Sequence, residues 1–153
     1  MISQKTKYAI KALITLAEEQ ASGGSSLRIE EIASRSNAPK RFLEHILIDL
    51  RNGGIIGSRR GRDGGYVLIK SPESVSVSEV LRMIDGPIAP LPCLSRRAYQ
   101  RCEDCTDEAT CRIRKVFGDL FSAYVLMVES LTLSDLMRDD SVLSIGDLVE
   151  VLP

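Results

Sequence analysis

The 153-residue sequence lacks the features that would place it in a membrane or outside the cell. It has no unbroken apolar run long enough to cross a bilayer. Residues 1–20 include lysines but neither an apolar core segment nor a small-residue cleavage site, so they do not form a signal peptide. Cysteine is absent outside residues 93–111. We therefore expect a cytoplasmic protein with no membrane partner, in a compartment where thiols stay reduced.

Charge is nearly balanced over the whole chain but is divided unevenly along it. Residues 1–72 contain 12 Lys and Arg against 7 Asp and Glu, whereas residues 73–153 contain 8 against 14. A basic half joined to an acidic half indicates that one end binds a polyanion such as nucleic acid. Splits of this kind also arise by chance, so the charge alone does not decide the function.

Hydrophobic spacing predicts three helices in the first part of the chain. The first begins after Ser3, which can cap it, and ends in the loop ASGGSS. The second is short and covers RIEEIASRS. The third lies within residues 37–54, with Pro39 in its first turn and the Gly53-Gly54 pair at its end. Its buried stripe is expected at Leu43, Ile46, Leu47 and Leu50.

Two short strands, IIGS and GYVLI, follow and flank RRGRDGG, whose Asp-Gly-Gly is typical of a hairpin turn. A fourth helix then begins with a capping-box pattern, Ser76 with Glu79. After the proline-rich linker GPIAPLPC, apolar residues recur at helical spacing from Ile113 to Leu131. A helix this long is unstable alone, so its apolar stripe must be buried against another surface.

These elements predict a mostly α fold with a small β-hairpin wing. The expected class is a winged helix-turn-helix followed by a long C-terminal dimerisation helix. The DNA-binding domain would cover residues 1–86 and the linker with the cysteine loop residues 87–106. The dimerisation helix would cover residues 107–137, and a tail would occupy residues 138–153.

The third helix of a winged helix-turn-helix enters the DNA major groove, and the hairpin touches a neighbouring groove or the backbone. The candidate DNA-binding residues are Lys40, Arg41, Glu44 and His45 on the helix, and Arg59, Arg60 and Arg62 on the wing. Arg pairs with guanine edges and Glu accepts from cytosine, whereas wing arginines suit phosphates or a narrow minor groove. Each feature alone is common on solvated surfaces. Together on two DNA-facing elements they favour a double-stranded DNA operator as the partner.

All four cysteines lie within residues 93–111, with the spacing C-x8-C-x2-C-x5-C. Thiolates bind iron–sulfur clusters or tetrahedral zinc, and four of them suffice for either. The candidate ligands are Cys93, Cys102, Cys105 and Cys111. Nearby arginines, and the expected place of Cys111 in the first turn of the long helix, are expected to lower the thiol pKa values. An iron–sulfur cluster is the expected cofactor; zinc, a disulfide switch in which Cys102 and Cys105 can take part, and no ligand at all are the alternatives.

The chain also contains four longer stretches with a familiar pattern: KYAIKALITLA, IEEIASRSNAPKRFLEHILIDLRNGGII, SRRGRDGGYVLIKSPESVSVSEVLRMIDGP and TLSDLM. Together they resemble the IscR-like family of winged-helix bacterial transcriptional regulators, which includes NsrR and CymR relatives. The wing of RGxxGGY type and the FLE of the third helix make the resemblance specific. It implies a homodimeric repressor whose long C-terminal helices cross. It also matches Glu44 to the glutamate that sets site preference, and Arg60 to the wing arginine.

The resemblance implies three cysteine ligands, because Cys105 and Cys111 keep the separation found in cluster-binding members and Cys93 takes the place of the first. The gap from Cys93 to Cys105 is longer here, and Cys102 is additional. The non-cysteine ligands of the family do not carry over, since Arg114 and Lys7 stand at their positions. Cys102 is therefore the candidate fourth ligand of an all-cysteine site.

A small thiol enzyme using Cys102 and Cys105 is a rival interpretation. A thioredoxin-like CxxC is expected in a βαβ setting, which this sequence does not supply. The one histidine, His45, lies on the third helix, so no Cys–His–Asp set is available. A structural zinc module that holds a dimer is a third interpretation. We expect a non-enzymatic repressor that senses iron, sulfur or redox state; the alternative is a regulator of the same fold that senses a small molecule or partner protein without metal.

Overall fold

The computed structural model describes residues 2–138, and most of the expected tail therefore lies outside the described residues. The helices are α1 (Gln4–Ala21), α2 (Ile29–Ser36), α3 (Lys40–Asn52), α4 (Val77–Ile84), α5 (Arg112–Ser130) and α6 (Leu133–Met137). Two strands, β1 (Ile56–Arg59) and β2 (Gly65–Leu68), form an antiparallel hairpin. Two short 3₁₀ helices are η1 (Pro72–Ser74) and η2 (Pro92–Leu94). The predicted fold class, mostly helical with a β-hairpin wing, is confirmed.

The first three helices follow the predicted pattern closely. Ser3 caps α1, because its Oγ accepts a hydrogen bond from the Thr6 amide at 3.1 Å. The predicted stripe of α3 is fully buried in the core: Leu43, Ile46, Leu47 and Leu50. Pro39 differs from the expectation, since it precedes the helix instead of standing in its first turn. Its backbone is extended, with ψ of 129°, while its carbonyl accepts the first helical bond from Phe42 at 3.0 Å.

Both predicted strands are present to within one residue at each end. The ladder runs from the pair Ile56–Leu68 to the pair Arg59–Gly65, so residues 60–64 form the turn. At the start of α4, Ser76 Oγ accepts from the Glu79 amide at 3.1 Å, as a helix cap does. The reciprocal half of the expected capping box is absent. The Glu79 carboxylate instead accepts from Lys70 Nζ at 2.5 Å, because the chain after the wing brings that cation beside it.

The single helix expected over residues 107–137 is two helices, α5 and α6, and α5 begins only at Arg112. The break has a tertiary cause. The Val77 amide donates to the Leu131 carbonyl, and the Leu133 amide donates to the Val75 carbonyl, each at 2.8 Å. This short bridge holds the chain extended between the helices. Thr132 and Asp135 then form a capping box that starts α6.

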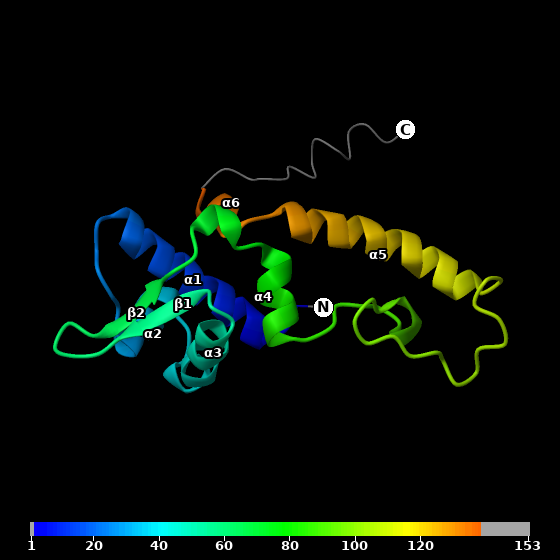
Figure 1. Ribbon diagram of the computed structural model, residues 1–153, viewed down its shortest axis with the longest axis horizontal. Helices are drawn as coiled ribbons and strands as arrows, with labels where there is room; N and C mark the ends of the chain where they lie inside the picture. Colours follow the sequence, from blue (N-terminus) through cyan, green and yellow to red (C-terminus); the bar gives the residue numbers. More distant parts are fainter. Residues whose placement is uncertain (1, 139–153) are drawn as a thin grey trace.

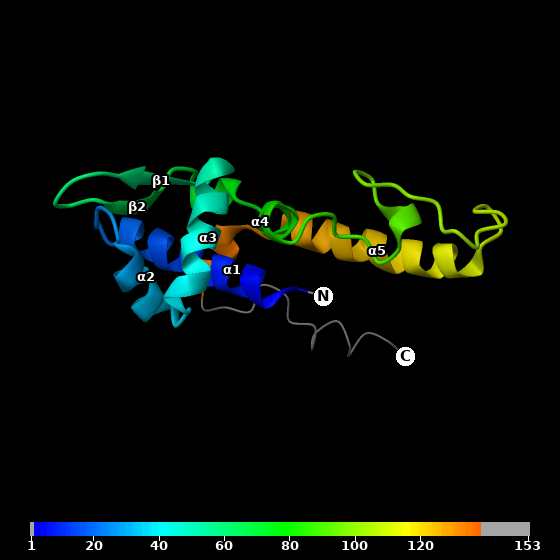
Figure 2. The same ribbon diagram turned by 90° about the horizontal axis from the view of Figure 1, so that it is seen from below.

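One core joins α1, α2, α3, the hairpin and α6, and a smaller apolar cluster of Val77, Leu81 and Val128 joins α4 to α5. The views in Figures 1 and 2 place the hairpin at one end of the molecule and the loop before α5 at the opposite end, with α4 between them. None of the helices within residues 2–138 is long and apolar enough to span a membrane.

Candidate nucleic-acid interface and cysteine loop

The outer face of α3 carries the predicted reading residues. Lys40, Arg41, Glu44 and His45 are all exposed, on the side of the helix opposite its buried stripe. The wing arginines Arg59, Arg60 and Arg62 are exposed at the end of β1 and in the hairpin turn. The hairpin and α3 are adjacent in sequence and lie on the same part of the molecule (Figure 2). The structure therefore presents both basic elements together, at the end away from α5.

Lys40 is paired with a carboxylate that the sequence did not single out. Its Nζ lies 2.6 Å from Glu30 Oε1, which belongs to the first turn of α2. The hydrogen bond between them raises the pKa of Lys40 and lowers the pKa of Glu30. A DNA phosphate must compete with Glu30 for this cation. An acidic residue ten positions before a helix-start lysine was the available sign, but the sequence does not show that the two side chains meet.

Arg41 rests on an aromatic platform that the sequence analysis also missed. Its guanidinium lies 5.0 Å from the centre of the Phe42 ring, and that ring packs against Tyr8 of α1 at 5.6 Å between centroids. A cation over an aromatic face is attracted to it and loses part of its freedom. Phe42 is 38% exposed, so it is a surface aromatic residue beside the reading face.

The wing arginines differ from Lys40 in their surroundings. Among residues 2–138, no Asp or Glu side chain lies within ion-pair distance of Arg59, Arg60 or Arg62. Their guanidinium groups are exposed and unneutralised, as suits contacts with phosphates or a narrow groove. The wing is thus the more available of the two cationic elements.

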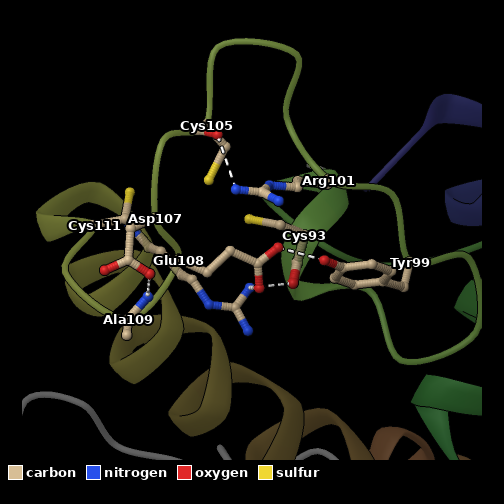
Figure 3. Close-up of polar contacts among 9 residues, drawn as sticks. Cys93, Tyr99, Arg101, Cys105, Asp107, Glu108, Ala109 and Cys111 are labelled. Atoms are coloured by element: carbon tan, nitrogen blue, oxygen red, sulfur yellow. Dashed lines mark hydrogen bonds and ion pairs between the residues drawn. The ribbon is translucent and has the colours of Figure 1, made fainter.

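The four cysteines occupy one irregular segment between the linker and α5. Cys93 lies in η2 and is buried, Cys102 and Cys105 are half-buried on the loop, and Cys111 is the residue just before α5. Figure 3 shows Cys93, Cys105 and Cys111 coming from separate parts of this loop. Cys111 was expected inside the first helical turn but is instead the cap. Its Sγ accepts from the Arg114 amide at 3.4 Å.

Arginines and one carboxylate organise the loop around these thiols. Arg101 donates to the carbonyls of Cys105 at 3.1 Å and Thr106 at 3.0 Å. Arg114, in the first turn of α5, donates to the Cys93 carbonyl and lies 3.6 Å from the Glu108 carboxylate, which also accepts from the Tyr99 hydroxyl (Figure 3). Arg114 therefore ties the start of α5 to the segment that holds Cys93.

The chemical environment of Cys102 contradicts the expectation that the arginines would lower every thiol pKa. The neighbouring Cys93 thiol, as a hydrogen-bond partner, raises the pKa of Cys102, and partial burial raises it further. Negative charge on Cys93, Asp104 and Cys105 acts in the same direction. Two neighbouring thiols and one carboxylate thus favour the protonated form of Cys102.

Four thiols gathered on one loop match the donor set that iron–sulfur clusters and zinc require. They do not form a finished ligand cage in this structure, because within residues 2–138 no three Cys, His, Asp or Glu side chains converge as a metal site. The donor chemistry thus suits a soft metal, and the arrangement of the loop does not select one.

The apolar stripe of α5 remains largely uncovered. Leu120 is 63% exposed, and Ile113, Val116, Phe117, Tyr124 and Met127 are exposed as well. A groove of about 750 Å³ lies beside the stripe, between α5 and the linker, and is lined by Ile88, Pro90, Phe117 and Phe121 among others. Contiguous exposed apolar surface of this kind marks an interaction site.

Three helices, a cationic hairpin and a long helix with an open apolar face define a winged-helix DNA-binding protein. The model of the Rrf2 family, described as an iron-dependent transcriptional regulator, matches residues 2–139. The chain belongs to the Rrf2 family of transcriptional regulators. The family and the relatives are regulators and not enzymes, which excludes the thiol-enzyme interpretation.

Comparison with individual proteins agrees with this assignment. The rrf2-like HTH-type transcriptional regulator of Rhodobacter capsulatus is 62% identical over 138 residues, covering 90% of this chain and 92% of the relative. CymR of Bacillus subtilis is 34% identical over 113 residues, covering 70% of this chain and 80% of CymR. The solved structure of CymR, described as the global cysteine regulator of that organism, superimposes with a TM-score of 0.74 at 28% identity, covering 92% of this chain and 98% of CymR. T. potens IscR shares the fold, with a TM-score of 0.70 at 22% identity, covering 91% of this chain and 87% of IscR.

Proposed function

We propose that this protein is a homodimeric repressor of transcription that binds a double-stranded DNA operator and senses iron, sulfur or redox state through an iron–sulfur cluster. Cys93, Cys105 and Cys111 would be ligands, with Cys102 as the fourth. When bound, the cluster would supply a group whose presence depends on iron and oxidants. A regulator of this kind works where the DNA is, in the cytoplasm.

The position of Cys111 carries this proposal. It caps α5, and Arg114 in the first turn of the helix is bonded to the Cys93 segment. A change in how these thiols are held therefore acts directly on the start of the helix with the open apolar face. The iron dependence in the description of the family supports iron as the signal.

DNA recognition in this proposal uses both exposed basic elements. Lys40, Arg41, Glu44 and His45 would face the major groove, and Arg59, Arg60 and Arg62 would contact the backbone or an adjacent groove. The second copy would cover the α5 stripe. Two copies then present two reading surfaces to one operator, as helix-turn-helix dimers do.

Purification without oxygen tests the cluster. The visible spectrum with iron and sulfide content should report a cluster in the wild-type protein and its loss in Cys93→Ser, Cys105→Ser and Cys111→Ser. Operator affinity should differ between loaded and metal-free wild-type protein. Thr106→Ser, on the same loop, is the matched control and should behave as wild type. Cysteine variants that keep full iron content and normal regulation would point instead to a regulator that senses a small molecule or partner protein.

A disulfide switch is the second candidate, because the Cys93 and Cys102 thiols are neighbours. A peroxide would take two electrons and the two thiol protons, forming the sulfur–sulfur bond and water. Mass spectrometry of peptides prepared without reductant should then find Cys93 linked to Cys102 after peroxide treatment. Zinc in place of iron would appear in the same metal analysis, and a purely structural zinc would leave operator affinity insensitive to oxygen.

A further inference from the structure

The loop between α1 and α2 lies against the wing. Leu27, which is buried, pairs with Tyr66 of β2 in both directions: its amide donates to the Tyr66 carbonyl at 3.0 Å, and the Tyr66 amide donates back at 2.8 Å. Leu27 thus acts as a short third strand beside the hairpin. The base of the wing is fixed to the helical core through this contact.

Two side chains on either side of Leu27 reach further, to the turn of the wing. Ser26 Oγ donates to the Asp63 carbonyl at 2.7 Å, and Arg28 Nη2 donates to the Arg62 carbonyl at 2.7 Å. The strand ladder ends at the pair Arg59–Gly65, so it does not hold residues 60–64. Within this turn the backbone makes one bond of its own, from the Gly64 amide to the Gly61 carbonyl at 3.0 Å.

Gly65 permits this close approach. A Cβ at Gly65 would stand 2.5 Å from the Leu27 carbonyl oxygen and 2.7 Å from its carbon. Both atoms belong to the backbone and cannot turn aside, so any larger residue would push the loop and wing apart. The contact between the loop and the wing therefore depends on glycine at position 65.

We infer that Ser26 and Arg28 are positioning residues for DNA recognition, which hold the wing turn in the shape that presents Arg60 and Arg62 to DNA. This inference rests on the proposed contact between the wing and DNA. Without the two bonds, the five-residue turn would sample more conformations. That freedom would be lost on binding DNA, which lowers affinity even when every arginine is retained.

Ser26 separates positioning from direct contact. It carries no charge, it is half-buried, and its hydroxyl hydrogen is directed to a wing carbonyl. Its removal therefore takes away no cation from the DNA-facing surface. Ser25 is the matched control, because it is exposed and makes no side-chain hydrogen bond among the described residues.

The test compares Ser26→Ala with Ser25→Ala. Ser26→Ala should bind operator DNA roughly three- to tenfold more weakly, the usual effect of losing one hydrogen bond. In the free protein it should also speed amide hydrogen exchange in residues 60–64, while exchange in α3 stays as in wild type. Ser25→Ala should change neither measurement.

A second background distinguishes this inference from the proposed DNA contact. In Arg60→Ala/Arg62→Ala protein, Ser26→Ala should cost no further affinity, because the turn no longer carries cations to position. The positioning role would be overturned if Ser26→Ala lowered affinity in that background by as much as it does in the wild-type protein. Wild-type affinity and wild-type exchange rates in Ser26→Ala would overturn it as well. Unchanged DNA affinity in the Arg60→Ala/Arg62→Ala protein itself would overturn the wing contact with DNA and, with it, the role of Ser26 and Arg28 in recognition. The exchange rates would still report whether Ser26 holds the wing turn.

Discussion

Lys40 and Arg60 carry the same charge but stand in different surroundings. Lys40 is neutralised by Glu30 at 2.6 Å, whereas Arg60 has no carboxylate within ion-pair distance among residues 2–138. A phosphate gains more from an unpaired cation, because no existing partner has to be displaced. At the scale of single residues, Lys40 on α3 is therefore held in an ion pair, whereas the wing arginines have no such partner among residues 2–138.

Glu30→Gln should raise operator affinity roughly twofold to fivefold at low salt, because it frees Lys40 and removes a negative charge beside the DNA. The dependence of affinity on salt should also become steeper. Fluorescence anisotropy over a salt series measures both effects. Glu73→Gln, which changes the same charge on η1, is the control. Equal affinities of the two variants would mean that Glu30 does not restrain Lys40.

Arg60→Ala and Glu44→Ala should have different consequences. Loss of Arg60 would remove the proposed backbone or minor-groove contact, so binding should weaken on most sequences and the salt slope should become shallower by about one. Glu44 would be an acceptor near base edges in the proposed complex, so its loss should change which operators are preferred. Selection from a random DNA library measures the preference. The same preferred motif from wild type and Glu44→Ala would exclude this residue from recognition.

Ser3→Ala should lower the free energy of unfolding by about 1–2 kcal/mol, since Ser3 caps α1. Ser3 also donates to the Asp85 carboxylate from its amide, at 3.1 Å, and from its hydroxyl. Burial opposes ionisation of Asp85, but the bonds from Ser3, with smaller contributions from Thr6 and the Lys5 charge, together lower its pKa. This part of the stability is full above the ordinary carboxyl pKa and is lost as the pH falls through the lowered value. The difference in the free energy of unfolding between wild type and Ser3→Ala, measured by denaturant titration, should therefore become smaller in acid. Ser3→Thr should restore most of the lost stability.

Each helix of the winged domain buries one face, whereas α5 leaves an apolar face open. Val125 and Val128 are buried, Val128 against Val77 and Leu81 of α4, and the stripe that includes Leu120 and Tyr124 is exposed. One small domain does not have enough surface to cover both sides of a helix of 19 residues. At the scale of the element, α5 is therefore built to pack against a second surface, and we propose another copy of the chain.

Replacing Phe121 and Tyr124 together with Asp should convert the proposed dimer to monomers and weaken operator binding by about tenfold or more, because two linked DNA-binding surfaces bind more tightly than one. Light scattering and anisotropy measure the two effects. Ser122→Asp, at an exposed position on another flank of α5, adds one negative charge outside the stripe and is the control. A dimer that persists in the Asp variant would place the interface elsewhere.

Across the whole molecule, the cysteine loop and the wing lie at opposite ends (Figure 1). Two connections lead from α5 to the winged domain: α4, which contacts both α5 and α1, and α6, which follows α5 along the chain and packs into the main core. Arg82 of α4 reaches Glu129 of α5 at 2.5 Å, and Asp85 at the end of α4 accepts from Ser3 at the start of α1. Through α4, these bonds connect α5, which follows the cysteine loop, to α1, which packs against α3.

Glu129→Gln should reduce the difference in operator affinity between the loaded and metal-free protein by roughly twofold or more, while iron content stays at the wild-type level. The reason is that one charged link between α4 and α5 is weakened without any change to the thiols. Paired anisotropy titrations with and without metal measure the difference. Asp119→Asn, on the same helix and without an ion pair among the described residues, should leave it unchanged.

Local patterns predicted the elements well where the cause was local. The α3 stripe from Leu43 to Leu50 follows from helical spacing, and the hairpin follows from turn residues between two β-prone runs. Prediction failed where distant residues met. Glu79 pairs with Lys70 instead of completing its cap, Leu131 is held extended by Val77, and the Cys102 pKa is raised beside Cys93.

The amino-acid sequence by itself determined the order of helices and strands, the charge of the reading elements and the gathering of the thiols, because these depend on neighbouring residues. Only the tertiary structure decided which charges are free. It placed Glu30 on Lys40, left the wing arginines without a carboxylate partner from the part of the chain that the structure describes, and joined Ser26 and Arg28 to the wing turn. Such contacts join segments that the chain brings together only after its core has packed, and the spacing of residues along the sequence carries no record of them.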